Sequence, residues 1–510
     1  MRALLVVLVV TLFALMCPPL PAALVTASGL GGAVTIAGVV PVAVREGLAM
    51  RDMMLPANTD LHFVLGLSSR NPAGFDAALR AVYDPHNPMY RHFLAAETIT
   101  TRFGPDPAQV QALKQWLVSQ GLHPQPWAGS MLLDVRGTAA RVSTAFGIGM
   151  WRYRPAAQLA LKSAVSVDAA NRIVPSFAPD RDPRVPSQFS GLITSIVGLQ
   201  GTIQPVAQAV AHAAPAARPR RGPAGGYDPA QIAGAYDFKP LYAAGYHAAN
   251  TRVAIVEFAP YDPADIRAYD TWAGVNSTIH NIAVGDSTGS HTGSIEATLD
   301  IELLSSTAPG ATIDVYNAPN DATGVGLLDA YSAVVSAGNA QVLGLTWVTC
   351  EAAALQIKGL VPDEHALFKQ LALLGTTIVS ATGDAGAYAC SDSRGASTSL
   401  ASQPTVNLPA SDPYSLAVAA TDLTVRTTSG VSAIGYETAW SCNATHSPAC
   451  AHTGFKGLGS GGGVSTVFQT GDTYGDDMSW QIGPGVGNKF SGGARQVPDV
   501  AISGSSGISI

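Results

Sequence analysis

The segment DEHALFKQLALLGTTIVSATGDAG, Asp363 to Gly386, contains a helical pattern followed directly by a short β-rich apolar run. The same alternation recurs through the C-terminal half of the chain. Its β-rich runs are RVAIVEF (Arg252–Phe258), ATIDVYNAP (Ala311–Pro319), QVLGLTWV (Gln341–Val348) and TTIVSATGDAG (Thr376–Gly386), with helical stretches between them. This alternation predicts an α/β fold in which helices cover both faces of a parallel sheet. From about Tyr388 onward the chain is rich in Gly, Ser and Thr, and we expect mostly loops there.

Three polar or aromatic side chains follow the predicted strands closely. Glu257, Trp347 and Asp384 each lie at or just after a strand end. In open parallel sheets, functional groups collect at the carboxyl ends of the strands. We therefore expect these three residues to share one edge of the sheet.

The helical stretch GSIEATLDIELLSSTAPGA, Gly293 to Ala311, places two acids four residues apart within an apolar face. These acids are Glu296 and Asp300, and like charges at this spacing repel one another. Glu302 falls outside the apolar arc, so a solvated helix face explains Glu302 better than it explains the pair. The local pattern alone leaves a functional pair and a solvated face as open alternatives. The apolar arc consists of Ile295, Leu299, Leu303 and Leu304.

Length and composition limit the class of protein. The chain has 510 residues, enough for two or three domains with full cores. Only 13% of its residues are charged and the net charge is −7, which argues against nucleic-acid binding. The one basic cluster, RPRR at 218–221, lies in an Ala- and Pro-rich segment, 202–226, that is typical of a linker.

The N-terminus, MRALLVVLVVTLFALMCPPLPAALVTA, has the pattern of a secretory signal peptide over residues 1–27. A membrane anchor is the alternative, but prolines end the apolar run short of the ~18 residues that a span needs. No later segment has the pattern of a membrane span. The sequence thus predicts a secreted protein with a first domain over 28–201 and a second over 227–510.

The number of cysteines is consistent with a secreted protein. Cys17 would be removed with the signal, which leaves four cysteines in an oxidising compartment. The spacing of these residues suggests no zinc site, so disulfides are favoured. The four are Cys350, Cys390, Cys442 and Cys450.

Several motifs, in this order, resemble the sedolisins, a family of serine-carboxyl peptidases with a subtilisin-like fold. In the first half they are YDPHNPMYRHFL, FGPDPAQVQALKQWL and GTAARVSTAFG, which are similar to the family's activation prodomain. In the second half they are RVAIVEF, EATLDIELLSSTAPGA, GDAG, LPASDPY, GGGVS and RQVPDV. The resemblance covers nearly everything from about Thr35. It implies a subtilisin-like peptidase domain preceded by an α+β, ferredoxin-like prodomain that inhibits it.

The resemblance also implies roles for individual residues. Glu296 matches the family's general base, Asp300 the carboxylate behind it, and Asp384 the oxyanion-hole aspartate. Glu257 and Trp347 match positions that support this network. A glutamate with a pKa near ~4.3 accepts a proton from a serine chiefly in acid, and an aspartate donates to an oxyanion only while protonated. We therefore expect hydrolysis of protein or peptide substrates at acid pH.

The chain departs from the family after RQVPDV. The family's nucleophile lies in a Gly-Thr-Ser motif, and none occurs after Arg495. SGSSG at 503–507 lies too close to Pro498 to be that motif. We expect the nucleophile and the family's calcium loop to lie beyond Ile510, so that the chain as given is truncated and inactive. Ca²⁺ is accordingly an expectation from the family, without ligands in this chain.

The sequence therefore predicts a secreted, monomeric acid peptidase zymogen whose partners are its substrates and its own prodomain. We expect no partner nucleic acid, and no membrane after signal removal. An inactive homologue that only binds peptides or acts through its prodomain is the alternative; a true subtilisin is disfavoured because no His-Gly-Thr segment occurs. The cysteines are predicted to pair as Cys350–Cys390 and Cys442–Cys450, with Cα separations of ~4.4–6.8 Å.

Overall fold

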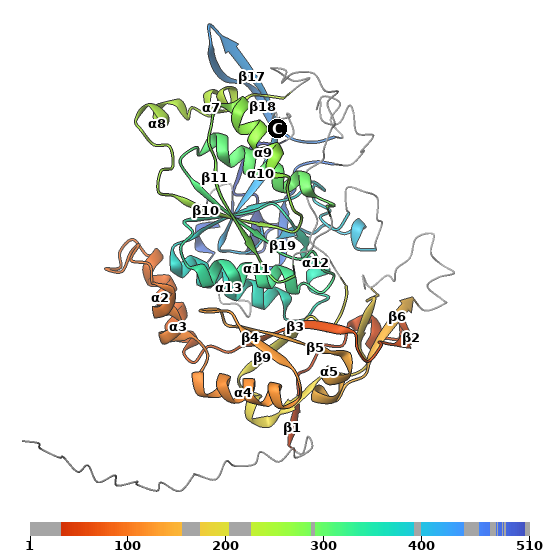
Figure 1. Ribbon diagram of the computed structural model, residues 1–510. Coiled ribbons are helices and arrows are strands. Elements are labelled where there is room, and N and C mark those ends of the chain that lie inside the picture. The colour runs from red at the N-terminus through yellow and green to blue at the C-terminus, as the bar shows by residue number, and fades with distance from the viewer. Residues whose placement is uncertain are drawn as a thin grey trace, which may run out of the picture.

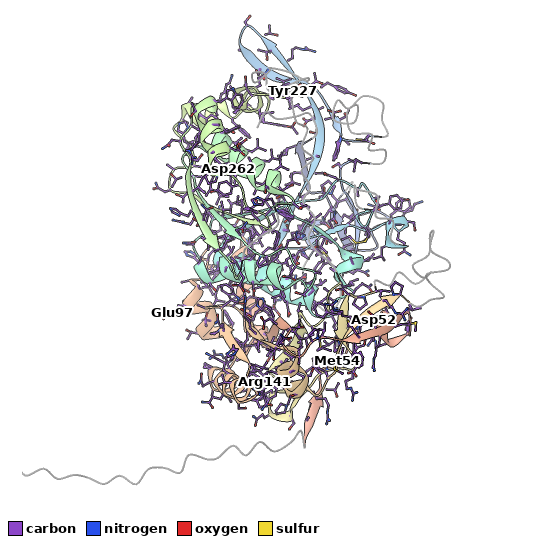
Figure 2. All side chains as sticks on the ribbon, turned by 45° about the vertical axis from the view of Figure 1, so that its right-hand side comes forward. Asp52, Met54, Glu97, Arg141, Tyr227 and Asp262 are labelled. Carbon is purple, nitrogen blue, oxygen red and sulfur yellow. A yellow bond between two sulfur atoms is a disulfide. The ribbon has the colours of Figure 1, made fainter. Side chains whose placement is uncertain are left out.

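The computed structural model describes residues 32–155, 174–202, 226–286, 291–391, 399–442, 458–469, 476, 478–481, 483 and 486–504. The predicted signal peptide lies outside these residues, as does all of the predicted linker except its two end residues. Two domains are visible (Figure 1), and Figure 2 marks Glu97 and Arg141 in the first and Tyr227 and Asp262 in the second. Within the described residues, no helix is both long enough and apolar enough to cross a membrane.

The N-terminal domain is built on a four-stranded antiparallel sheet with the order β4-β5-β3-β9. This is the β-α-β-β-α-β arrangement of ferredoxin-like folds, as predicted. The sheet comprises β3 (Asp60–Leu67), β4 (His123–Pro126), β5 (Leu132–Thr138) and β9 (Ile193–Val197). Its helices are α2 (Pro72–Tyr83), α3 (Ala96–Phe103), α4 (Pro107–Ser119) and α5 (Ala139–Phe146).

Smaller elements complete this domain. They are β1 (Ala33–Thr35), α1 (Val42–Arg45), β2 (Ala49–Met54), β6 (Met150–Pro155), β7 (Phe177–Pro179), β8 (Arg184–Pro186) and the 3₁₀ turn η1 (Ser187–Phe189). β1 pairs with β8, and β2, β6 and β7 form an antiparallel sheet.

The C-terminal domain contains an eight-stranded sheet with the order β11-β12-β10-β13-β15-β17-β18, in which β21 also pairs with β17. All pairings are parallel except that of the β17–β18 hairpin. The strands are β10 (Arg252–Glu257), β11 (Thr278–Ala283), β12 (Thr312–Asn317), β13 (Val342–Leu345), β15 (Thr377–Ala381), β17 (Ser415–Thr428), β18 (Val431–Ala439) and β21 (Val500–Ser503). The predicted α/β class is confirmed.

Helices cover both faces of this sheet, and alternate side chains of β10 pack against helices on opposite faces. Val253 and Ile255 pack in one core with α9 (Pro263–Ala273) and α10 (Ser294–Thr307). Ala254 and Val256 point the other way and pack with α11 (Val325–Ala337) and α13 (Leu360–Leu374). The remaining elements are α7 (Pro229–Ala235), α8 (Lys239–Ala243), β14 (Thr349–Cys350), α12 (Glu351–Ala354), η2 (Ser399–Ser402), β16 (Asn407–Leu408), β19 (Gly463–Gln469), η3 (Ser479–Gln481) and β20 (Ala494–Val497).

The two domains share apolar packing. One face of the N-terminal sheet packs on its own helices, α4 and α5. The other face contributes Val64, Leu132 and Val197 to the core that contains α11 and α13. These two helices therefore lie between the two sheets (Figure 1).

The expectation of loops after Tyr388 is wrong for one long stretch. β17 and β18 form a hairpin of 14 and 9 residues, joined at Ser429 and Gly430, both of which have positive φ. Along β17, buried residues alternate with more exposed ones up to Leu423, which is the pattern of a strand that is buried on one face.

Candidate active site

The carboxyl ends of three neighbouring strands bring the predicted residues to one edge of the sheet. Glu257 is the last residue of β10, Trp347 comes just after β13, and Asp384 follows β15. Because β10, β13 and β15 are adjacent and parallel, these ends lie side by side. α10 follows β11, so its first turn, which contains Glu296, begins at the same edge.

Glu257 is the most deeply buried of these acids, with no exposed surface. Its Oε2 accepts a hydrogen bond from Trp347 Nε1 at 2.8 Å. Burial raises the pKa of Glu257 well above its ordinary value, and the charges of Asp300 and Glu296 raise it further. Burial and these neighbouring charges therefore favour the neutral, protonated form of Glu257.

Asp300 lies beside this protonated acid. Thr346 Oγ1 donates to Asp300 Oδ2 at 2.7 Å, and Glu257 and Asp300 hydrogen-bond to each other. Two carboxyl groups can hydrogen-bond only if one carries a proton, and the more strongly raised pKa assigns that proton to Glu257. Burial raises the pKa of Asp300 to about 6, although the bonds from Thr346 and Glu257 oppose this shift.

Glu296 lies one helical turn before Asp300 on α10 and is 2% exposed. Residues four apart on a helix lie on the same face, so the two side chains project from α10 in the same direction. Glu296 also contributes to the raised pKa of Glu257 through its charge. The charges of Asp300 and Glu296 on α10 thus both act on the protonation of Glu257 on β10.

Asp384 sits in a bend that is held by glycine-rich backbone. Gly459 N donates to Asp384 O at 2.8 Å and Gly461 N donates to Gly383 O at 2.7 Å. A Cβ on Gly461 would lie 2.0 Å from Thr382 O, so only glycine permits this approach. Burial raises the pKa of Asp384 to about 7. The Asp384 carboxyl is therefore protonated, and able to donate, in mild acid.

A disulfide lies close to this edge in sequence and in space. Cys350 and Cys390 are bonded with a Cα separation of 5.2 Å, which joins the segment after Trp347 to the segment after Asp384. This is one of the two predicted pairs. Cys442 is also disulfide-bonded, while its predicted partner, Cys450, lies outside the described residues.

Comparisons with known proteins show which proteins this chain is similar to. Residues 49–202 match the family described as Pro-kumamolisin, activation domain. The chain is 28% identical over 490 residues to sedolisin from Pseudomonas sp. (strain 101), covering 93% of this chain and 75% of that protein. The chain is thus similar to a sedolisin over nearly its whole length.

Two other relatives show the same similarity. Xanthomonalisin from Xanthomonas sp. (strain T-22) is 26% identical over 484 residues, which is 89% of this chain. Kumamolisin from Bacillus sp. (strain MN-32) is 29% identical over 344 residues, which is 63% of this chain. The chain spans 54% of each of these two proteins, about half of their length.

One solved structure is that of the Pseudomonas sedolisin, a serine-carboxyl proteinase complexed with two molecules of pseudo-iodotyrostatin. It matches with a TM-score of 0.44 and 27% identity, covering 55% of this chain and 70% of that one.

At the carboxyl edge of the sheet, direct contacts join Glu257, Trp347 and Asp300. They also include Thr346, which the sequence interpretation missed. A signal for Thr346 was present, because its hydroxyl comes immediately after a buried strand at the carboxyl edge. The expectation that Glu302 lies on a solvated face is wrong: Glu302 is 2% exposed, and burial raises its pKa to about 8. α9 packs against α10 and covers it.

One group of side chains in the described part of the chain has the composition of a metal site. Ligand atoms of His62, Asp134 and Asp329 lie within 4.8 Å of one another. The group lies at the domain interface, and its shortest distance, 2.6 Å between His62 Nε2 and Asp134 Oδ1, is that of a direct hydrogen bond. Calcium prefers oxygen ligands, so this group does not fit the Ca²⁺ expected from the family.

Proposed function

We propose that this chain is the zymogen of a secreted, acid-acting serine-carboxyl peptidase that hydrolyses peptide bonds in proteins or peptides. The observation that carries the proposal is the hydrogen-bonded carboxyl pair, Glu257 and Asp300, beside Glu296 at the carboxyl edge of the sheet. Buried acids that shift one another's protonation are typical of catalytic sites.

In the proposed reaction, a serine hydroxyl attacks the peptide carbonyl and Glu296 accepts the hydroxyl proton. Asp300 lies behind Glu296, and Glu257 supplies Asp300 with a hydrogen bond. Proton transfer to Glu296 is assisted because Asp300 and Glu257 can redistribute a proton between them. Trp347 and Thr346 hold the orientation of these two carboxyls.

The serine attack also needs a group that stabilises the oxyanion that forms on the peptide carbonyl. Asp384 would donate a hydrogen bond to it, and this donation requires the protonated carboxyl. Because burial raises the pKa of Asp384 to about 7, the donor would be present through the acid range. The upper pH limit of activity would then follow the ionisation of Asp384.

No Gly-Thr-Ser motif occurs after Arg495, so the proposed serine nucleophile is not assigned to a residue of this sequence. An inactive homologue that binds peptides is the competing function. The two are separated by appending a sedolisin C-terminal segment that carries Gly-Thr-Ser, with Gly-Thr-Ala as the matched control. Acid hydrolysis of a fluorogenic peptide by the Ser form alone supports the peptidase; inactivity of both folded forms supports the inactive homologue.

The N-terminal domain would act as the intramolecular inhibitor of a monomeric enzyme. Its match to the activation domain of pro-kumamolisins supports this role, as does its packing on α11 and α13. Export would follow from the signal pattern of residues 1–27.

A further inference from the structure

The interface between the N-terminal domain and helices α11 and α13 buries acids that catalysis does not use. Asp363 in the first turn of α13 is 5% exposed. It accepts a hydrogen bond of 2.6 Å from Ser195 Oγ on β9. Ser195 Oγ in turn accepts from Gly66 N on β3 at 3.1 Å, and a Cβ on Gly66 would lie 2.5 Å from Asp363 Oδ1. The N-terminal sheet therefore lies directly on this carboxyl group.

In the described part of the chain, no cation compensates the charge of Asp363. Among the described residues, it forms no ion pair with Lys, Arg or His. A carboxylate that loses water without gaining a cation is costly, whereas the neutral acid is not. Closing the two domains over Asp363 thus favours its protonated form.

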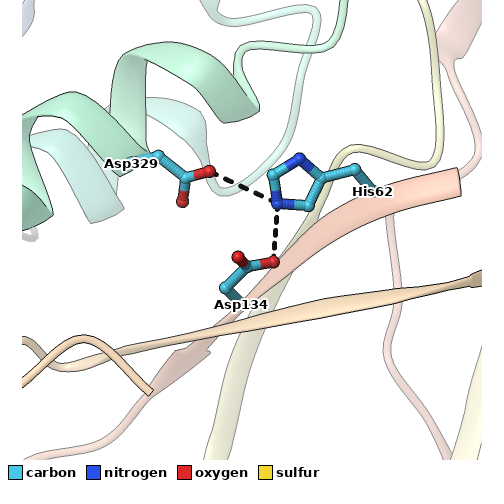
Figure 3. Close-up of side chains that lie close together, drawn as sticks. All are labelled: His62, Asp134 and Asp329. Atoms are coloured by element: carbon cyan, nitrogen blue, oxygen red, sulfur yellow. Dashed lines mark hydrogen bonds and ion pairs between the residues drawn. The ribbon is translucent and has the colours of Figure 1, made fainter. Parts of the chain in front are cut away.

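A second buried group spans the same interface (Figure 3). His62 Nε2 lies 2.6 Å from Asp134 Oδ1 within the N-terminal domain and 3.3 Å from Asp329 Oδ2 on α11. Trp127 Nε1 donates to Asp329 Oδ1 at 3.1 Å. The side chains of Asp134 and Asp329 are 9% and 3% exposed, so two buried carboxyls share one imidazole.

Three other charged groups act on this cluster. Arg136 on β5 opposes the protonation of His62, but it is itself paired with Asp286 of the C-terminal domain. Asp321, just before α11, adds a further negative charge near Asp329. Docking of the N-terminal domain thus brings Asp134 close to Asp329, and their repulsion is relieved when a proton is bound.

We infer that the interface between the two domains takes up protons when it forms, through Asp363 and through the His62–Asp329 pair, so that the domains hold each other more tightly in mild acid than at neutral pH. Docking of the two domains needs no catalytic turnover, so it can be measured whether or not the chain is an active peptidase.

Docking and proton binding are thermodynamically linked, and this linkage gives the direction in which pH changes the strength of docking. Burial raises the pKa of Asp363 and that of Asp329 to about 7 in the docked state. An aspartate open to water titrates near ~3.9. Between these values the docked state binds more protons, so docking strengthens as pH falls through this window and weakens as pH rises through about 7.

Docking also raises the pKa of His62. Burial lowers the pKa of His62, but Asp134 and Asp329 together raise it above its ordinary value. Separation of the domains removes Asp329 and leaves Asp134, so part of this raise exists only in the docked state. Proton uptake by His62 therefore also favours the docked state in mild acid.

Hydrogen–deuterium exchange of the intact 510-residue chain tests the inference without any turnover. Protection of peptides that cover β9 and α13 is compared at about pH 7.5 and about pH 5.5, where each group can contribute up to about tenfold per pH unit. A peptide that covers β10 corrects for the intrinsic exchange rate. We expect protection at the interface to rise at least about tenfold in acid. Unchanged or reduced protection would overturn the inference.

Variants test whether Asp363 and Asp329 cause the pH dependence of docking. Asp363→Asn combined with Asp329→Asn should give nearly pH-independent protection that is already high at neutral pH. Asp76→Asn, which removes the ion pair with Lys369 across the same interface, should weaken docking equally at both pH values. Retention of the full pH dependence in the double variant would refute the assignment.

Infrared spectroscopy provides a second measurement if the double variant does not fold. In mild acid the parent should absorb more strongly in the protonated-carboxyl C=O region than the single variant Asp363→Asn, so that a parent-minus-variant difference spectrum contains a band from Asp363. A difference spectrum without that band would refute protonation of Asp363. The exchange experiment is repeated with a chelator. An unchanged result supports proton uptake, whereas loss of the acid-induced protection would identify the His62 cluster as a metal site and overturn the inference.

Discussion

Trp347 donates its indole N–H to Glu257 Oε2 over 2.8 Å, and Glu257 has no exposed surface. The same indole ring packs edge-on against Phe258, with 5.5 Å between ring centroids. Trp347 therefore has two separable functions: it fills the core and it satisfies a buried acid. A substitution that keeps the ring but removes the N–H isolates the second function.

Trp347→Phe should lower the free energy of unfolding by about 1–3 kcal/mol, because it leaves a buried acceptor without its donor. Urea unfolding monitored by circular dichroism measures this change. Trp272→Phe is the control, since Trp272 is 36% exposed and should tolerate the replacement. An equal, negligible effect of both replacements would contradict the role assigned to the Trp347 N–H.

Asp384 should determine the upper pH limit of activity in a catalytically complete form of the protein. Asp384→Asn retains a donor that does not ionise, so the loss of activity near pH 7 should move to higher pH. Asp384→Ala lacks a donor and should lower kcat by about 10²–10³-fold. The kcat–pH profiles of the two variants provide the test. If Asp384→Asn kept the parent's upper limit, the oxyanion role would be wrong.

Stability should decline as pH rises from acid to alkaline values. Several buried or half-buried acids have raised pKa values in the folded state, so the folded state binds more protons than the unfolded chain, and stability is lost as these acids ionise. They include Asp300, Glu302, Asp329, Asp363, Glu364 and Asp384. Thermal unfolding across the pH range should therefore give the highest midpoint in acid.

Glu302→Gln tests one contributor directly. Because burial raises the pKa of Glu302 to about 8, the variant should match the parent in acid. Above pH 8 it should exceed the parent by at least about 1 kcal/mol, since it removes a buried charge. Glu97→Gln, an exposed helical position, is the control and should change little at any pH. A parent-like pH profile for Glu302→Gln would show that Glu302 ionises as freely when folded as when unfolded.

The sequence predicted the parallel sheet and the gathering of functional groups at its edge because these follow from local pattern. β-rich apolar runs alternate with helical patterns along the sequence of the C-terminal domain. The end of each predicted strand therefore marks a position at the carboxyl edge of the sheet. The hairpin of β17 and β18 was missed because its long alternating strand is built from small residues and threonines, and the Gly- and Ser-rich composition suggested loops.

The burial of Glu302 and the contact of Asp329 with His62 could not be predicted from one segment. Glu302 is covered by α9, and His62 reaches Asp329 from 267 residues away in sequence, on another domain. Periodicity describes one element at a time, whereas burial depends on which elements pack together. Thr346 shows the reverse case, where the local signal existed but a threonine at a strand end is too common to stand out.

The most direct test of the proposed site is the activity of Glu296→Gln and Asp300→Asn in a chain completed with a Gly-Thr-Ser segment. Each replacement keeps the shape of the side chain and removes its ability to ionise. Loss of the general base should lower kcat for an acid-assayed fluorogenic peptide by about 10²–10⁴-fold. Circular dichroism should show that both variants remain folded. A large loss of kcat in folded protein is the predicted result, and near-parental activity of either variant would contradict the assignment of this carboxyl pair as the catalytic base and its support.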